Sequence, residues 1–330
     1  MGILTQASLN CPKFKCVSSG TLDSGFCIGE NSGIYYISPC TDYQESYCPP
    51  DFGIKNVSCE IPPVLTHTKY PGEKCIQDTD CLYGTCTQNV CLGQSLYSNC
   101  QAYGECNPGL RCMSGNGKCV PLGNPGDTCD SDYDCLPELG CDDGFCKPYY
   151  SVENGEWINN CTNGESNICK SGQCLYGYCI EGLKSQNVPM GCGGQSDCVS
   201  LDLSDQGIEF YTNCTCGYNT KGQSYCYLFP GDDPYVEYIQ IRKQWIDIGI
   251  MNKCNTVRRW STECMISQYK KSFSMEYMYK EIRALYYPMI YGMDSCVGQV
   301  AYNQYYQADE FINNISIWNI LGFGLLSILV

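Results

Sequence analysis

The sequence contains one histidine, His67, among 330 residues. A catalytic triad or a histidine general base would have to use this residue. It lies in the stretch LTHTKY, close to Pro62 and Pro63, and no GxSxG or HExxH motif accompanies it. We therefore predict that the protein is not an enzyme, that it has no catalytic residue and no cofactor, and that His67 is an exposed linker residue.

Basic residues are also scarce, because 20 Lys and Arg stand against 35 Asp and Glu, for a formal net charge of −15. The imbalance is local: residues 1–230 carry 11 basic and 25 acidic side chains, whereas residues 231–330 carry 9 and 10. A surface this negative repels phosphate backbones, so we do not expect nucleic acid as a partner. Solubility explains the acidity, and affinity for divalent cations or for a basic partner protein are the alternatives.

Phenylalanine is rare as well, with 9 residues against 28 tyrosines. A tyrosine ring can lie half buried while its hydroxyl stays in water, so this composition predicts shallow cores. Small modules with shallow cores bury too little apolar area and depend on crosslinks.

Cysteine is abundant, with 30 residues, or about 9% of the chain. This content marks a disulfide scaffold, and disulfides persist outside the cell or in a secretory compartment. Zinc and iron–sulfur sites would need C-x₂-C spacings, which the sequence lacks, and a supply of histidines, of which it has one. We therefore predict structural disulfides, no metal, and an extracellular or cell-surface location reached by the secretory pathway.

The cysteine spacing predicts several modules. Residues 1–70 form an N-terminal cysteine-rich module, residues 71–180 contain four tandem four-cysteine repeats, and residues 181–230 form a divergent fifth repeat. Each of two stretches, PGEKCIQDTDC and PGDTCDSDYDC, combines a Pro-Gly turn with an acidic loop before the second cysteine. The clearest candidate disulfide residues, from the first and third repeats, are Cys75, Cys81, Cys86, Cys91, Cys129, Cys135, Cys141 and Cys146.

The acidic loop Asp130-Ser-Asp132-Tyr-Asp134 raises the question of calcium, since it has carboxylates at alternate positions. An EF-hand needs glycine at the sixth place and a carboxylate at the twelfth, where this chain has Cys135 and Cys141. We expect a solvated acidic loop, with a weak calcium site as the alternative.

The character of the chain changes after Pro230, and residues 231–314 read as a helical domain. Asp232-Asp233-Pro234 predicts a helix start, with acidic residues before a proline in the first turn. Apolar spacing predicts a longer helix over Asn255–Tyr287, which Pro288 ends or kinks, and a third helix from about Val300. The predicted fold class is therefore small disulfide-rich modules in tandem, made of short β-hairpins and loops, followed by a C-terminal α-helical region.

Cysteine parity predicts a long-range bond. The fifth repeat holds five cysteines and the helical region holds three: Cys254, Cys264 and Cys296. If every cysteine pairs, either a disulfide crosses Pro230 or the fifth repeat pairs upstream. We predict the crossing, formed by Cys296, with Cys254 and Cys264 bonded as the clip of a helical hairpin.

The two ends carry targeting information. Met1–Asn10 is short and uncharged, so we expect that a secretory leader is missing from this sequence or that Gly2–Ser8 is its remainder. The apolar tail, residues 315–330, has three interpretations: a GPI signal without a full spacer, part of a transmembrane helix, or a segment buried against partner chains.

Asn-x-Ser/Thr sequons indicate glycosylation in the oxidised region, and we expect it at Asn56, Asn160 and Asn213. A fourth sequon, at Asn314, adjoins the apolar tail, which disfavours it on steric grounds.

The repeated unit, Gly-x-x-Cys-x₅-Cys with acidic residues before the second cysteine, resembles the Dickkopf N-terminal cysteine-rich and EB-type modules over about residues 71–226. GEKCIQDTDC and GDTCDSDYDC carry the likeness. Such modules occur in extracellular proteins, including large cell-surface families of ciliates. The resemblance implies a fold type and a compartment rather than a single activity.

These observations together predict an oxidised rod of modules whose helical end anchors it at a membrane or in an assembly. We expect a non-enzymatic cell-surface or filament-forming structural protein that contacts copies of itself or other surface proteins. The alternative is a soluble secreted ligand-binding or inhibitor protein, in which one acidic loop presents the binding determinant.

Overall fold

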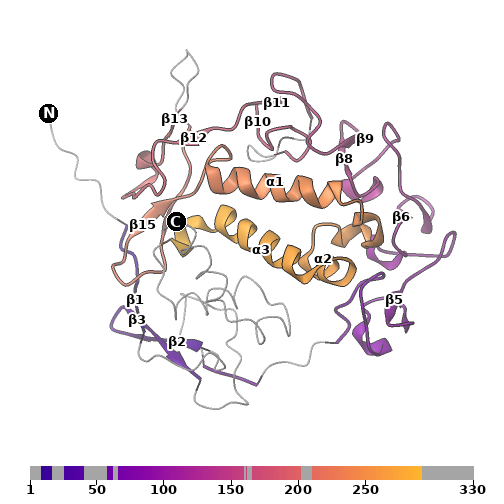
Figure 1. Ribbon diagram of the computed structural model, residues 1–330, viewed down its shortest axis with the longest axis horizontal. Coiled ribbons are helices and arrows are strands. Elements are labelled where there is room, and N and C mark those ends of the chain that lie inside the picture. The colour runs from indigo at the N-terminus through magenta and orange to yellow at the C-terminus, as the bar shows by residue number, and fades with distance from the viewer. Residues whose placement is uncertain are drawn as a thin grey trace.

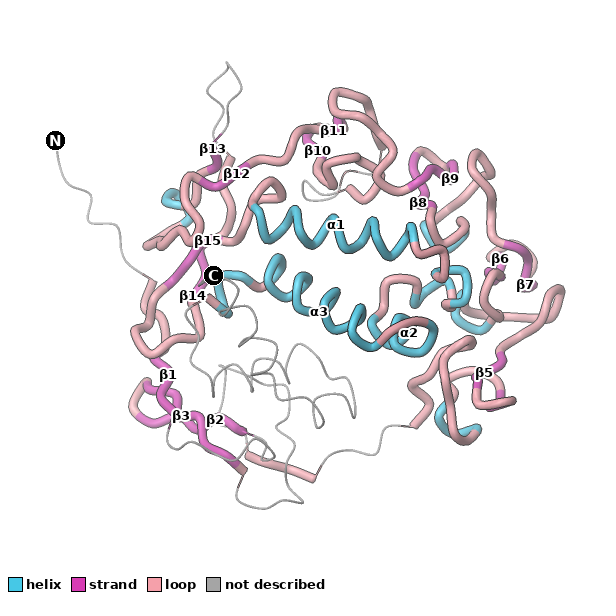
Figure 2. The backbone as a smooth tube through the Cα atoms, viewed as in Figure 1, coloured by secondary structure: helices cyan, strands magenta, loops and turns pink. Residues whose placement is uncertain are grey.

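The computed structural model describes residues 9–16, 26–40, 58–61, 66–159, 161, 166–201 and 210–291. Small β-hairpins follow one another along an arc, and the long helices lie inside it (Figure 1). Loops and turns make up most of the arc (Figure 2). Short hairpins in small sheets followed by a helical region confirm the predicted fold class.

The N-terminal module contains a three-stranded sheet. Strand β2 (Phe26–Asn31) pairs antiparallel with β3 (Ile34–Pro39), and β1 (Lys13–Cys16) pairs parallel with β3. Phe14 and Ile37 are fully buried, and the Phe14 ring packs against Tyr218 from the fifth repeat. The N-terminal sheet is therefore anchored to a segment about 200 residues further along the chain.

Each of the four tandem repeats folds as a short 3₁₀ turn or loop followed by a two-stranded hairpin. The 3₁₀ turns are η1 (Asp78–Asp80), η2 (Tyr103–Glu105) and η3 (Asp132–Asp134). The hairpins are β4 (Thr85–Thr87) with β5 (Val90–Leu92), β6 (Leu110–Met113) with β7 (Lys118–Pro121), β8 (Leu139–Asp142) with β9 (Phe145–Pro148), and β10 (Cys174–Leu175) with β11 (Tyr178–Cys179).

All four repeats share one disulfide pattern, in which the first cysteine bonds the third and the second bonds the fourth. The third and fourth cysteines face each other across the hairpin, so each bond ties one strand to the loop before it. Loops this short correspond to about 3 kcal/mol per bond. The pairs are Cys75–Cys86, Cys81–Cys91, Cys100–Cys112, Cys106–Cys119, Cys129–Cys141, Cys135–Cys146, Cys161–Cys174 and Cys169–Cys179.

The fifth repeat keeps this pattern through Cys192–Cys214 and Cys198–Cys226. Its elements are η4 (Gln195–Asp197), β12 (Lys184–Ser185) paired with β13 (Ser200–Leu201), and β14 (Cys214–Cys216) paired with β15 (Ser224–Cys226).

The odd cysteine of the fifth repeat, Cys216, bonds Cys11. The predicted disulfide between the fifth repeat and Cys296 is therefore wrong, because all five cysteines of that repeat have other partners. Parity allowed pairing upstream, and the contact between Phe14 and Tyr218 brings Cys11 close enough to use it. Cys296 itself lies outside the described residues.

The helical region begins as the sequence predicts. Helix α1 (Asp233–Asp247) has Asp232 at its N-cap and Pro234 in its first turn. The buried Asp232 carboxylate also accepts hydrogen bonds from the Ser185 amide at 2.7 Å and the Ser185 hydroxyl at 2.5 Å. The helix start is thus joined to β12. Antiparallel to α1 lies a second long helix, α3 (Lys271–Leu285) (Figure 1).

The single long helix predicted over Asn255–Tyr287 is wrong. The segment forms η6 (Thr256–Arg258), α2 (Thr262–Gln268), α3 and α4 (Tyr287–Ile290), and a further turn, η5 (Met251–Lys253), precedes it. Ten residues of α-helix span about 15 Å. Cys254 and Cys264 are bonded with their Cα atoms 5.7 Å apart, which excludes a continuous helix between them.

The expected rod is wrong as well, since the repeats curve around the helices (Figure 1). The first three repeats have small cores, made mainly of their cysteines. The main core instead joins Ile158 and Ile168 of the fourth repeat to Ile239 and Trp245 of α1. Apolar helix faces need cover, and the repeats supply it. Tyr277 and other buried tyrosines line this core, so the cores are not uniformly shallow.

Several predictions concern residues outside the described part of the chain. These are the helix from about Val300, the tail 315–330, and the sequons at Asn56, Asn160 and Asn314. Among the described helices, none is both long and apolar enough to cross a lipid bilayer.

Candidate functional site

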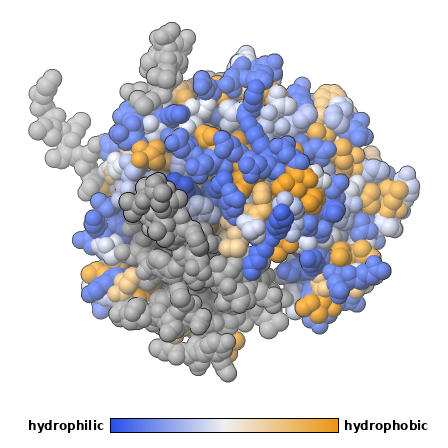
Figure 3. Space-filling view, in the orientation of Figure 1, coloured by the Kyte–Doolittle hydropathy of each residue, from blue (hydrophilic) through white to orange (hydrophobic). Residues whose placement is uncertain are grey.

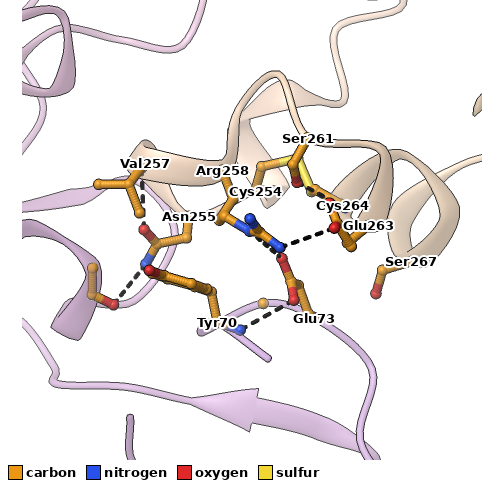
Figure 4. Close-up of polar contacts among 12 residues, drawn as sticks. Tyr70, Glu73, Cys254, Asn255, Val257, Arg258, Ser261, Glu263, Cys264 and Ser267 are labelled. Atoms are coloured by element: carbon orange, nitrogen blue, oxygen red, sulfur yellow. Dashed lines mark hydrogen bonds and ion pairs between the residues drawn. A yellow bond between two sulfur atoms is a disulfide. The ribbon is translucent and has the colours of Figure 1, made fainter. Parts of the chain in front are cut away.

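Residues 254–268, which we call the clamp loop, contact the first three repeats. The Cys254–Cys264 disulfide closes most of this segment, and the Ser261 hydroxyl accepts a hydrogen bond from the Cys264 amide at 3.2 Å to begin α2 (Figure 4). Both cysteines are buried. A short crosslinked loop of this kind keeps little conformational freedom and holds its side chains in place.

The first repeat is bound through Arg258, whose guanidinium lies between Glu73 of the repeat and Glu263 of α2, at 3.3 Å from each (Figure 4). The same guanidinium packs over the Tyr70 ring. Glu73 is 1% exposed, and burial raises the pKa of its carboxyl although the nearby Arg258 acts to lower it. A second link is the hydrogen bond from the Lys74 amide to the Ser267 hydroxyl at 2.8 Å.

The second and third repeats are bound through their backbone carbonyls. The Asn255 amide donates to the carbonyls of Gly104 and Cys106, at 3.0 and 2.9 Å. The fully buried Arg259 donates to the carbonyls of Cys135 at 3.0 Å and Leu139 at 3.0 Å. These donors satisfy backbone carbonyls within η2, directly after η2 and η3, and at the start of β8, where a carbonyl buried without a partner would be costly. The clamp loop therefore fixes the relative positions of the repeats.

Carboxylates of the acidic loops accept hydrogen bonds from their own turns, and this corrects part of the expectation of a solvated loop at residues 130–134, since Asp134 is buried while Asp130 is exposed. The Asp80 carboxylate accepts from the Ile76 amide at 2.7 Å, and Asp134 accepts from the Asp130 amide at 2.8 Å. Asp134 is 2% exposed and forms an ion pair with Arg111 at 2.6 Å. Burial alone would raise the pKa of Asp134, but the Arg111 and backbone hydrogen bonds outweigh it, so the pKa lies below its ordinary value.

Similar contacts count against the alternative prediction of a weak calcium site in this loop, because protein donors occupy two of its carboxylates. Asp132 accepts from the Cys141 amide at 2.7 Å and from the Tyr149 hydroxyl at 2.8 Å. With Asp134 also engaged, two carboxylates of this loop already have protein partners. The close cysteine sulfurs in the first, second, third and fifth repeats belong to disulfides, and a disulfide sulfur lacks the thiolate charge that binds zinc.

Two bridged residues on the outer surface of each repeat differ in residue type from one repeat to the next. In each repeat, a residue before the first cysteine forms an isolated β-bridge with the residue before the fourth. We call these two residues the outward pair. The first member is exposed in every repeat, and the second is exposed or half buried. The four pairs are Lys74 and Val90, Asn99 and Lys118, Thr128 and Phe145, and Trp157 and Tyr178.

Two tyrosines occupy left-handed backbone positions on the outer surface. Tyr97 has φ +66° at the place where the other three repeats have the glycines Gly72, Gly126 and Gly155, each with φ above +80°. Tyr176 has φ +49° at the tip of the fourth hairpin, where the first and third repeats have Gln88 and Asp143. A bulky residue at positive φ is uncommon and strained. Tyr97 and Tyr176 are 68% and 81% exposed.

A polar cluster lies within the main core. The Arg242 guanidinium packs over Trp260 at 4.1 Å and donates to the Asn167 side chain at 2.8 Å. Tyr238 donates to Glu281 at 3.0 Å, and burial raises the pKa of Glu281 above its ordinary value. These groups pair with one another around a cation, which is how a core accommodates charge.

His67 and Asn213 are both exposed. The His67 amide donates to the Thr79 carbonyl at 2.6 Å. Asn213 lies beside β14, and its carbonyl accepts from the Tyr227 amide. Sequence reasoning missed the clamp loop. The available signal was the adjacent pair Arg258 and Arg259 in a chain poor in cations.

Comparison with known proteins finds a relative that matches part of this chain. The chain is 34% identical over 94 residues to the "Turripeptide OL55-like" protein of Lophiotoma acuta, and the match covers 26% of this chain and 90% of that protein. The chain belongs to the turripeptide OL55-like family. This membership supports a cysteine-rich, disulfide-stapled protein, and the disulfides are consistent with an extracellular location.

A second relative of this chain is the "Prion-like-(Q/N-rich) domain-bearing protein 25" of Caenorhabditis elegans, 25% identical over 187 residues. The match covers 43% of this chain and about a quarter (26%) of that protein. No protein-family model matches, so the resemblance to Dickkopf and EB-type modules gains no support. No solved structure matches either.

Proposed function

We propose that the protein is an extracellular, non-enzymatic binding protein whose repeats present their outward pairs to a partner. The observation that carries this proposal is the contrast within the repeat. All four copies share the same two disulfides and the same hairpin, while the outward pair changes from Lys74 and Val90 to Trp157 and Tyr178. A rigid frame with a changing surface favours recognition, because pre-ordered residues lose little entropy on binding.

The clamp loop supports this interpretation over a filament of stacked modules. It holds three repeats in one arrangement through buried hydrogen bonds. The face in Figure 3 is mostly hydrophilic, with hydrophobic side chains in separate patches, several of them along the rim where the repeats lie. Small separate patches suit selective contacts better than the broad apolar interfaces of permanent assemblies.

Substitution of the outward pairs tests the proposal. In the outward-pair variant, seven of the eight residues become Thr, which suits strands, and Thr128 stays. Fluorescently labelled protein is titrated onto a panel of intact cells and immobilised extracellular matrix proteins. We expect saturable binding that falls at least about tenfold in the variant, equal to about 1.4 kcal/mol. The matched control is Glu276→Gln with Lys280→Gln on α3, which removes a surface ion pair and leaves the repeats intact.

Two results would overturn the proposal. One is unchanged binding by the outward-pair variant with its thermal midpoint preserved. The other is sedimentation of the wild-type protein as polymers at every concentration, which would restore the filament prediction. Turnover in a broad hydrolase screen would contradict the prediction of a non-enzymatic protein.

A further inference from the structure

We propose that the outward pair of the fourth repeat binds a cationic side chain, Arg or Lys, on a basic partner protein. The inference rests on the proposed function and specifies its chemistry. Three exposed aromatic residues lie together in this repeat: Trp157, Tyr176 and Tyr178, which are 59%, 81% and 48% exposed. Among the four outward pairs, only this one is wholly aromatic.

The ring geometry of the pair is well defined. Trp157 and Tyr178 are bridge partners, and their ring centroids lie 5.1 Å apart at 80°, an edge-to-face arrangement. The indole also rests against Gly177, where an added Cβ would lie 2.3 Å from the ring. The indole thus lies directly on the backbone at Gly177, packed between this glycine and the Tyr178 ring, with much of its surface in solvent. A pre-ordered aromatic surface binds with a small entropic cost.

The protein uses the same chemistry internally. The guanidinium of Arg242 covers Trp260 at 4.1 Å, and that of Arg258 covers Tyr70 at 5.1 Å. Among the described residues, no Lys or Arg lies over the Trp157 ring. Indole is the best of the protein rings for attracting a cation. Trp157 thus presents to solvent the kind of ring face that the half-buried Trp260 presents to Arg242 at the edge of the core.

Charge indicates the sign of the partner. Glu156 directly precedes Trp157, is exposed, and holds its carboxylate near the Glu153 amide at 3.3 Å, with no ion pair to a described cation. Residues 1–230 carry a net charge of −14. A negative ring face beside a carboxylate, on a protein of this charge, attracts cations and repels anions.

Backbone strain at Tyr176 supports recognition over packing. The residue is 81% exposed, so burial contributes little to offset the left-handed conformation. Strained residues that lack a packing role occur often at binding sites. Tyr176 therefore extends the aromatic surface at the hairpin tip.

The test uses the full oxidised chain and the indole N–H signal of Trp157 in a ¹⁵N spectrum, assigned through Trp157→Phe. Three probes are titrated: end-capped Gly-Arg-Arg-Gly, end-capped Gly-Gln-Gln-Gly, and a chitin tetrasaccharide. We expect the arginine peptide alone to shift the signal. Tyr176→Ala and Tyr178→Ala should each weaken peptide binding about two- to fivefold. Glu156→Gln should weaken it about twofold, and less at high salt.

Tyr97→Ala is the matched control, since Tyr97 is an exposed tyrosine at positive φ, as Tyr176 is, but lies in the second repeat and outside the outward pairs. It should leave peptide binding unchanged. The inference is overturned if the glutamine peptide shifts the indole equally, if the tetrasaccharide shifts it instead, which would make this a glycan site, or if no probe does. None of these outcomes changes the result expected for the outward-pair variant on cells and matrix proteins. Failure of this inference is therefore distinguishable from failure of the proposed function.

Discussion

Individual acidic residues in the repeats act as turn caps, and their protonation contributes to the loss of stability in acid. Asp80 and Asp134 each lie directly before the second cysteine of a repeat and accept backbone amides of their own loop. Hydrogen bonds from Ile76 and Gln77 hold the pKa of Asp80 below its ordinary value, and Arg111 and backbone amides do so for Asp134. Groups with a lowered folded-state pKa stabilise the protein above their unfolded pKa.

Asp134→Asn should destabilise the protein by about 1.5–3 kcal/mol at pH 7, because it removes a charged acceptor from Arg111 and two amides. The wild type should lose this stability as pH falls below the ordinary value of 3.8 and through the folded pKa, whereas the variant should show a flatter acid limb. Urea unfolding from pH 7 to pH 2 measures both. Parallel acid limbs would contradict the capping role.

Tyr97→Gly should leave stability unchanged or raise it by up to about 1 kcal/mol. The left-handed conformation costs a non-glycine residue about 1–2 kcal/mol, and the added flexibility of glycine in the unfolded chain offsets part of the gain. Thermal unfolding measures the change. Gly126→Tyr in the third repeat is the reciprocal variant and should destabilise. A large loss in Tyr97→Gly would show that the exposed ring contributes to folding.

At the level of elements, a disulfide overrides helix periodicity. Apolar spacing favours one helix after Asn255, but the bond between Cys254 and Cys264 brings its start and its tenth residue together. The chain forms η6 and α2 before α3, and this places the donors of the clamp loop against the carbonyls of the repeats. The break in the helix is therefore the feature that holds the repeats.

Arg259→Ala should destabilise the protein by about 3–5 kcal/mol, since buried carbonyls of the third repeat lose their donor. Amides in residues 129–148 should lose hydrogen-exchange protection before those of α1 and α3. Arg283→Ala is the matched control, because that arginine forms a surface pair with Glu237 at 3.4 Å and should cost less than about 1 kcal/mol. Equal costs in both variants would contradict the clamp.

At the level of the whole molecule, the arc is closed by Cys11–Cys216, a bond that spans 205 residues. The amide of Phe14 also donates to the Asn219 carbonyl at 3.2 Å, so backbone contacts support the closure. The helices fill the interior, which leaves the protein compact instead of rod-shaped (Figure 1).

Small-angle scattering should give a radius of gyration near the compact-domain value, roughly 20 Å for a chain of this length. Curvature of the repeats around α1 and α3 is the reason. A single-peaked distance distribution is expected, and the long linear tail that characterises a rod would contradict this arrangement.

Non-reducing peptide mapping should recover a peptide that joins Cys11 to Cys216 and none that joins residues 192–226 to residues 254–296. Replacing both Cys11 and Cys216 with Ser should cost about 2–5 kcal/mol, because a long loop of the unfolded chain is released. The hairpin disulfides should remain intact in that variant. Scrambled hairpin bonds would show that closure directs their pairing.

Local features were predictable from the sequence, and the reason is physical. Cysteine spacing predicted hairpin-sized modules, because the disulfides of the tandem repeats join residues only 10 to 13 apart. Asp232 and Pro234 predicted the start of α1, because capping depends on neighbours in the chain. The candidate site was harder to predict from the sequence, since the outward pair can be identified only when the β-bridges are known.

The sequence by itself determined the oxidised modules, the helical end and the acidic charge, all of which depend on composition and short-range spacing. Only the tertiary structure decided the arc, the Cys11–Cys216 closure and the clamp loop. Arg259 reaches carbonyls about 120 residues away, at Leu139 among others, and a backbone carbonyl is the same in every residue type. Such a contact does not constrain the residue type of the acceptor, so it cannot be predicted from a pattern of residues.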